Sequence, residues 1–100
     1  MYATRVRYTV NDSYVEQNKA NIRKVMDEVR AKSEGGVQYN AFVEADGKTF
    51  VHIVVVRDEA LKSVVPSTDA FKAFQAALKP NLEVPPANES WSLVGATYDL

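Results

Sequence analysis

The sequence contains no cysteine and only one histidine, His52, among its 100 residues. Without cysteine the chain has no disulfide, no thiolate nucleophile and no cysteine-ligated metal or iron–sulfur site. A site built from several histidines of one chain is excluded in the same way, because metals such as zinc need more than one such ligand. We therefore expect no metal site in this protein.

The chain also has little excess charge and no long apolar run. Its net charge is −1 and its pI is near 5.8, which gives no basic footprint for nucleic acid. No segment approaches the ~20 apolar residues of a membrane helix, and the first residues lack the apolar core of a signal peptide. We expect a cytoplasmic protein with neither a nucleic-acid nor a membrane partner, folded as one domain over residues 1–100.

The first third of the chain predicts a strand followed by a long helix. Residues 2–10 alternate between two sides and are rich in β-branched and aromatic side chains, which is typical of a strand. Cap candidates at residues 11–13 precede a stretch up to Lys32 in which apolar residues recur at helical spacing. Gly35-Gly36 is expected to end this helix.

The middle of the chain predicts a β-hairpin. Residues 37–45 and 48–57 resemble strands, and between them stands Asp46-Gly47, the strongest short signal for a two-residue type I′ turn. Such a turn fixes the register and places Ala41 opposite His52. One face then carries Tyr39, Ala41, Val43, Phe50, His52, Val54 and Val56. The other face carries Gln38, Asn40, Phe42, Glu44, Thr49, Val51, Ile53 and Val55.

The last part of the chain predicts a second helix and a fourth strand. A short helical piece over 58–65 ends at Pro66, and a cap among residues 67–69 starts a helix that ends at Pro80. Residues 81–90 are expected to form a surface loop, and residues 91–99 a strand with Gly95 as a bulge. The order β-α-β-β-α-β predicts a ferredoxin-like α+β fold. Its four-stranded antiparallel sheet has the first and third strands at the centre and both helices on one face.

The third strand is apolar on both faces, and two helices cover only one face of the sheet. The uncovered face, with Val51, Ile53 and Val55, predicts a homodimer in which two sheets pack together. The alternative is a monomer that exposes this apolar surface.

A family resemblance is carried by GGVQYNAFVEADGKTFVHIVVVRDEALKS and STDAFKAFQAALKP. These stretches resemble the Gly-x-x-x-Tyr edge strand, the third strand with its acidic helical piece, and the Phe-Lys-Ala-Phe second helix of the dimeric α+β barrel superfamily. Over nearly its whole length the chain is similar to the antibiotic biosynthesis monooxygenase (ABM-like) family. The resemblance implies one ferredoxin-like (ABM-like) domain that forms a dimeric α+β barrel.

The same resemblance implies an apolar cavity between the helices and the sheet of each subunit, suited to a small apolar or aromatic ligand. Some members oxidise quinols or anthrone-type aromatics with O₂ and without any cofactor, others degrade haem, and many have no known activity. Haem-degrading members carry a ligand histidine on the second helix, where this chain has none. They also commonly carry an aromatic at the position of Val56.

The cavity would bring together most of the aromatic side chains of this chain. His52 is the candidate catalytic base, since a buried neutral imidazole can accept a proton; the alternative is a hydrogen-bonded core histidine. The candidate substrate-binding residues are Tyr8, Tyr39, Phe50, Phe71, Phe74 and Trp91, with core packing as the alternative for each. We therefore expect a cofactor-independent monooxygenase acting on a small aromatic quinol or polyketide-like substrate. The alternative is a non-catalytic barrel that binds a small apolar ligand or serves a stress response.

Overall fold

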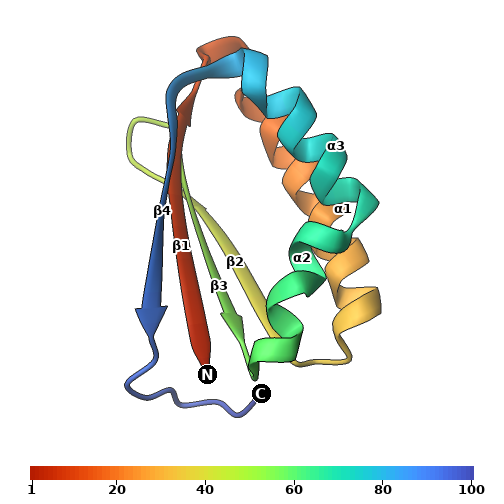
Figure 1. Cartoon of the computed structure of the whole chain (residues 1–100). Coiled ribbons are helices and arrows are strands. Elements are labelled where there is room, and N and C mark those ends of the chain that lie inside the picture. Colours follow the sequence, from red (N-terminus) through yellow and green to blue (C-terminus); the bar gives the residue numbers. More distant parts are fainter.

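Four strands form one antiparallel sheet in the computed structural model, which describes all 100 residues (Figure 1). The strands are β1 (Tyr2–Val10), β2 (Val37–Val43), β3 (Thr49–Val56) and β4 (Leu82–Ser92). Their order across the sheet is β2-β3-β1-β4, so the predicted central position of the first and third strands is confirmed.

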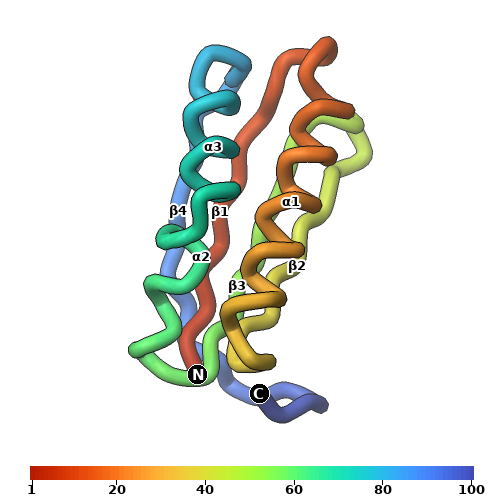
Figure 2. The backbone as a smooth tube through the Cα atoms, turned by 90° about the vertical axis from the view of Figure 1, so that its right-hand side faces the viewer, coloured from red at the N-terminus to blue at the C-terminus, as the bar shows by residue number.

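The helices all cover one face of this sheet. They are α1 (Val15–Ser33), the short α2 (Val64–Ser67) and α3 (Asp69–Leu78), with 3-10 turns at Asp12–Tyr14, Glu59–Ser63 and Lys79–Asn81. Figure 2 shows α1 and α3 side by side in front of the strands, with the two chain ends close together. The ferredoxin-like α+β architecture predicted from the sequence is confirmed.

The N-cap of α3 agrees with the sequence, whereas that of α1 does not; α1 ends, as expected, just before Gly35-Gly36. Thr68 Oγ1 accepts from the Phe71 amide at 3.1 Å, the expected N-cap bond of α3. At the start of α1 no side chain caps the helix; the Tyr14 amide instead donates to the Asn11 carbonyl through a 3-10 turn. This backbone bond already satisfies an amide that a side-chain cap would have served.

The hairpin register is confirmed, but the predicted turn type is wrong. Ala41 pairs with His52 and Val43 with Phe50. Of the two turn residues only Gly47 has a positive φ, at 78°, whereas a type I′ turn needs a positive φ at both. The Asp46 carboxylate accepts from the amides of Lys48 and Thr49 at 2.9 Å, which explains why a different turn is stable here.

The fourth strand lies earlier than the sequence predicts. The surface loop expected at 81–90 is wrong, because β4 spans Leu82–Ser92 and the residues after it form no strand. Pro85 and Pro86 argue against a strand, since proline cannot donate to a sheet ladder. They are tolerated because β4 is an edge strand with a register shift at this point. Gly95 therefore lies outside the sheet and forms no bulge.

The two faces of the sheet differ sharply in burial. On the helix side the core residues are Tyr8, Val10, Tyr14, Ile22, Val25, Val29, Phe50, Val65, Phe74 and Leu78. On the outer side Phe42 is 55% exposed, and Val51 and Ile53 are half-buried. Val55 is only 5% exposed, so its own chain already covers this member of the predicted dimer face.

Candidate functional site

Three strands and one helix bring four polar side chains together on the helix side of the sheet. His52 of β3 pairs with Val6 on β1 and with Ala41 on β2. Tyr8 and Tyr39 each lie two residues from one of these partners, so they share the face of His52 and stand diagonal to it. The strand register therefore places a tyrosine on either side of the imidazole.

These side chains form a continuous hydrogen-bonded chain. The Tyr8 hydroxyl lies 2.7 Å from His52 Nε2, and the Tyr39 hydroxyl lies 2.6 Å from His52 Nδ1. Asn18 of α1 donates through Nδ2 to the Tyr8 hydroxyl at 2.9 Å. We call these four residues the His52 network. Both nitrogens of the imidazole are occupied by protein groups.

Burial sets the protonation of the network. His52 is 4% exposed, and burial lowers its pKa to about 4, because no water compensates the charged form. Burial also raises the pKa of Tyr8 and of Tyr39 above the ordinary value of a phenol. Near neutral pH the network therefore consists of a neutral imidazole between two protonated hydroxyls.

Aromatic rings enclose the network. Phe50 stacks on Tyr8 with centroids 5.7 Å apart, and Phe74 of α3 lies 5.8 Å from His52 and 6.4 Å from Tyr8. Phe71 contacts Phe74 at 5.9 Å rather than the imidazole. The structure thus brings together Tyr8, Tyr39, Phe50, His52 and Phe74, with Phe71 one ring further away.

Trp91 lies apart from these rings. It pairs with Ala3, on the face of the sheet that points away from the helices, and its side chain is 43% exposed. Its Nε1 donates to Glu89 at 3.0 Å. The earlier start of β4 explains the difference, because Trp91 comes at the end of this strand instead of opening it. Trp91 therefore lies neither in a cavity nor in the core, the two places expected for it from the sequence.

Sequence reasoning missed Asn18. This side chain is fully buried, and it stands one helical turn before Ile22 on the stripe that continues to Val25 and Val29. A polar residue inside the apolar stripe of a helix is the signal that could have found it, since buried polar groups need partners.

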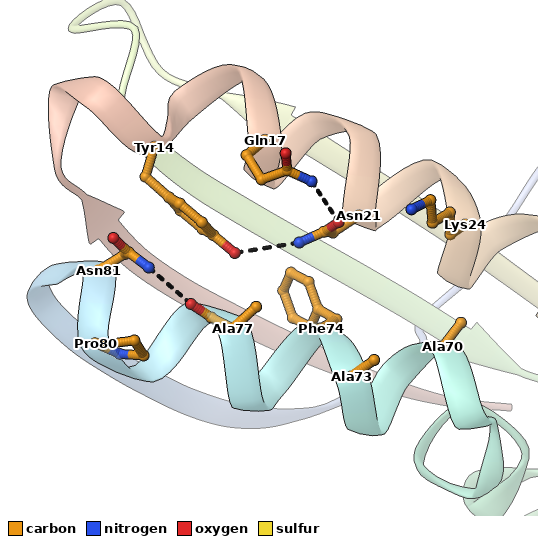
Figure 3. Close-up of a pocket in the computed structure, with 10 residues that line it drawn as sticks. All are labelled: Tyr14, Gln17, Asn21, Lys24, Ala70, Ala73, Phe74, Ala77, Pro80 and Asn81. Atoms are coloured by element: carbon orange, nitrogen blue, oxygen red, sulfur yellow. Dashed lines mark hydrogen bonds between the residues drawn. The ribbon is translucent and has the colours of Figure 1, made fainter.

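A groove of about 490 Å³ runs along the outside of the helix layer, between α1 and α3 (Figure 3). It is lined by Tyr14, Gln17, Asn21, Lys24, Ala70, Ala73, Phe74, Ala77, Pro80 and Asn81. A second groove of about 230 Å³ lies where α1 meets β2, and Phe50 lines it. His52 lines neither groove. The ring of Phe74 belongs both to the first groove and to the packing around His52.

The outer face carries a different kind of polar contact. Arg7 donates twice to Glu44, at 2.7 and 3.0 Å, and Arg5 contacts Glu89 at 3.4 Å. The hydrogen bond from Arg7 holds the pKa of Glu44 below its usual value. These pairs are open to water, in contrast to the His52 network.

The structure also bears on metal binding and on membrane-spanning helices. No group of three or more His, Asp or Glu side chains is placed to hold a metal ion. No helix is both long enough and apolar enough to cross a membrane.

Comparison with solved structures identifies the fold. A protein described as an antibiotic biosynthesis monooxygenase matches with a TM-score of 0.79 at 14% identity, covering 95% of this chain and 100% of its own. This chain has the fold of the antibiotic biosynthesis monooxygenases. A candidate enzyme of this kind from Nitrosomonas europaea matches with a TM-score of 0.83 at 16% identity, covering 95% of this chain and 100% of its own.

A variant of SnoaB, a cofactor-independent oxygenase from Streptomyces nogalater, also matches this ABM-like fold. Its TM-score is 0.75 at 15% identity, covering 98% of this chain and 97% of its own. No family model and no curated protein sequence matches the chain. The resemblance inferred from the sequence is therefore confirmed at the level of the fold.

Proposed function

We propose that the protein is a cytoplasmic, cofactor-independent monooxygenase that acts on a small aromatic quinol or polyketide-like substrate. The observation that carries the proposal is the neutral His52 held between two tyrosine hydroxyls on the helix side of the sheet. The fold supports it, because one protein that shares this fold is described as a cofactor-independent oxygenase.

The proposed reaction needs no group that the chain lacks. An electron-rich aromatic substrate first loses a proton, and the resulting anion reacts with O₂. For an anthrone-type substrate a CH₂ group becomes a carbonyl; one oxygen atom enters the product and the other leaves as water. The protein has to supply an apolar enclosure and hydrogen bonds that stabilise the anion more than the neutral substrate.

Within the His52 network, Tyr39 is the member that a substrate meets. Tyr8 is 2% exposed and Asn18 is fully buried, whereas Tyr39 lies half-buried on the edge strand β2. His52 contributes from behind Tyr39, because both of its ring nitrogens already have partners. In this proposal Tyr39 contacts the substrate and His52 holds the Tyr39 hydroxyl in place.

Phe74 controls the approach of the substrate from the helix layer. Its ring lines the groove between α1 and α3 (Figure 3). The same ring also packs against His52. In this proposal a rotation of this ring connects the groove with the network at His52, which Phe74 contacts. Phe74 and Phe71 supply aromatic surface along this route, and Phe50 closes the inner end by stacking on Tyr8.

Oxygen consumption with a panel of quinols and anthrones tests the proposed function. The purified protein is expected to accelerate O₂ uptake, and Tyr39→Phe to lower kcat about 100-fold, the loss typical of removing one hydrogen-bond donor to a reacting anion. Tyr2→Phe removes a hydroxyl outside the network and serves as the matched control. The proposal fails if the wild type accelerates no member of the panel, or if both variants react at the wild-type rate.

We further propose that the protein works as a homodimer through the outer face of the sheet. Phe42 is 55% exposed there beside the half-buried Val51 and Ile53, which is unfavourable in water unless another surface covers them. Light scattering is expected to give twice the chain mass at micromolar concentration, and Phe42→Asp to give the mass of one chain. A wild-type protein with the mass of one chain would remove this proposal.

The alternative function is the binding of a small apolar ligand without catalysis. It is favoured by one observation: His52 is sealed by aromatic rings and lines neither groove, whereas the groove between the helices is open. An apolar dye that binds with unchanged affinity in Tyr39→Phe, together with no O₂ uptake in the wild type, would support this alternative.

A further inference from the structure

The directions of the hydrogen bonds in the His52 network decide whether the network presents a hydrogen-bond donor or an acceptor to a ligand. A neutral imidazole has one N–H donor and one acceptor nitrogen, so the two tyrosines on either side of His52 cannot play the same role. One hydroxyl must donate to the ring and the other must accept from it. The distances of 2.7 and 2.6 Å do not by themselves show which.

Asn18 breaks this symmetry. Its Nδ2 donates to the Tyr8 hydroxyl, while its Oδ1 is buried and has no hydrogen-bond partner. Turning the amide over would give Oδ1 a partner but would leave the whole NH₂ group buried and unpaired. Unpaired buried N–H groups are rarer in proteins than unpaired carbonyl oxygens, so the observed orientation is the favoured one.

The remaining directions follow one after another. Because the Tyr8 oxygen accepts from Asn18, its own hydrogen is free for its other partner, Nε2 of His52. Nε2 is then the acceptor nitrogen, and the single ring proton sits on Nδ1. Nδ1–H donates to the Tyr39 oxygen, which leaves the Tyr39 O–H hydrogen without a partner inside the network.

We infer that Asn18 is a positioning residue that fixes His52 in the Nδ1–H tautomer and thereby makes the Tyr39 hydroxyl the outward donor of the network. A donor at this place suits an oxyanion, such as the phenolate or enolate form of an aromatic substrate. It does not suit a neutral hydroxyl that has to give up a proton to the ring. The assignment of the oxyanion rests on the proposed function; the tautomer does not.

The consequence for the chemistry is a change in the role of His52. A histidine with its acceptor nitrogen turned towards Tyr8 cannot take a proton directly from a substrate at Tyr39. The substrate proton leaves to solvent instead, and Tyr39 lowers the energy of the anion that remains by donating to it. The anion then forms a C–O bond with O₂, and the resulting peroxide anion takes up a proton from solvent. Cleavage of its O–O bond with loss of water leaves the carbonyl, so the proton released at the start is recovered and atoms and charge balance.

Nuclear magnetic resonance of the imidazole nitrogens tests the inference without any substrate. The chain has one histidine, so ¹⁵N-histidine labelling gives signals that belong to His52 alone. At pH 7 we expect a protonated Nδ1 and an unprotonated Nε2. Asn18→Leu removes the donor to Tyr8, and we expect the two nitrogen signals to move towards each other as both tautomers become populated.

Asn21→Leu is the matched control. Asn21 lies on the same helix and also donates to a tyrosine hydroxyl, that of Tyr14 at 3.1 Å, but this pair has no bond to His52. Its His52 signals are expected to equal those of the wild type, and the amide spectrum of each variant shows whether the fold is retained.

Two results would overturn the inference: a wild-type protein with the proton on Nε2, or an Asn18→Leu variant that keeps the wild-type tautomer. If the tautomer is as expected but the quinol panel gives no O₂ uptake, the proposed function fails and the role of Asn18 stands. If the wild type oxidises a quinol but carries Nε2–H, only the inference fails.

Discussion

Both faces of the sheet carry polar groups beside apolar ones, but these polar groups are buried and neutral on one face and exposed and charged on the other. On the helix side, Tyr8 and Tyr39 share one buried neutral histidine and carry no charge. On the outer side, Arg7 and Glu44 form a charged pair that water reaches. A buried polar group must be hydrogen-bonded and preferably neutral, whereas an exposed pair keeps its charge at little cost and contributes little. The helix side is therefore where specific chemistry can be built.

The largest difference between the faces is expected in the loss of a phenylalanine. Phe74 is 5% exposed and contacts both Tyr8 and His52, whereas Phe42 is 55% exposed on the outer face. Phe74→Ala is expected to lower the free energy of unfolding by about 3–5 kcal/mol, and Phe42→Ala by less than about 1 kcal/mol in a monomer. Urea denaturation at a concentration where the protein is monomeric measures both, and similar losses for the two variants would contradict the comparison.

The second-largest effect is expected from acid, which lowers the free energy of unfolding through His52 on the helix side. The pKa of His52 is about 4 in the folded chain and about 6.5 when unfolded, so between these pH values the unfolded state binds the extra proton. Stability is therefore fully present above pH ~6.5 and falls by about 3 kcal/mol as the pH drops towards 4.

The matched variant for this effect is His52→Gln, which cannot titrate. Carboxylates such as Glu44, whose pKa is lowered in the fold, also lose stability in acid, but they do so equally in both proteins. The difference between the two unfolding free energies, measured by denaturation from pH 7 to pH 4, isolates His52. Parallel curves would show that the imidazole is not held neutral.

A smaller effect is expected at the start of α3, which holds Phe74 over the network. Thr68 is fully buried and its hydroxyl accepts from the Phe71 amide. Thr68→Ala is expected to lower the unfolding free energy by about 1 kcal/mol, the usual cost of losing a cap. Ser67→Ala alters an exposed neighbour and should change it less; equal effects in thermal denaturation would argue against the cap.

The smallest effect is expected for the charged pair on the outer face. A double-mutant cycle with Arg7→Ala and Glu44→Ala should give a coupling smaller than the changes expected for Phe74, His52 and Thr68, because both groups are open to water. The coupling should fall further in high salt, which screens exposed charges. The cycle is measured at a concentration where the protein is monomeric; a coupling that resists salt there would contradict the exposure of the pair, whereas salt resistance only at higher concentration would mean that the partner of the proposed dimer covers it.

The fold could be predicted largely from periodicity and turn signals, with one clear failure. Asp46-Gly47 was enough to place Ala41 opposite His52, because a short hairpin loop leaves little freedom in the register. The sequence predicts the fourth strand too late in the chain, because Pro85 and Pro86 are typical of loops. Only the bulge in an edge strand explains how β4 accommodates them. Local sequence patterns do not show that this strand lies at the edge of the sheet, because that depends on the order of all four strands.

The candidate site could be predicted only in part, for a related reason. Residues on neighbouring strands, such as Tyr39 and His52, follow from the register. Asn18 comes from α1, and its contact with Tyr8 depends on how the helix packs across the sheet, which local patterns do not specify. The predicted position of Trp91 is wrong for the same reason as the predicted bounds of the fourth strand.

One measurement tests the central claim, that the helix side of the sheet holds a neutral imidazole on which both the proposed function and the role of Asn18 depend. It is the pH titration of the His52 ring signals by nuclear magnetic resonance in the intact protein. The structure predicts ring shifts that stay constant from pH 8 to pH 6 and a midpoint near the pKa of about 4. A midpoint close to 6.5, the value of a histidine in water, would contradict the account.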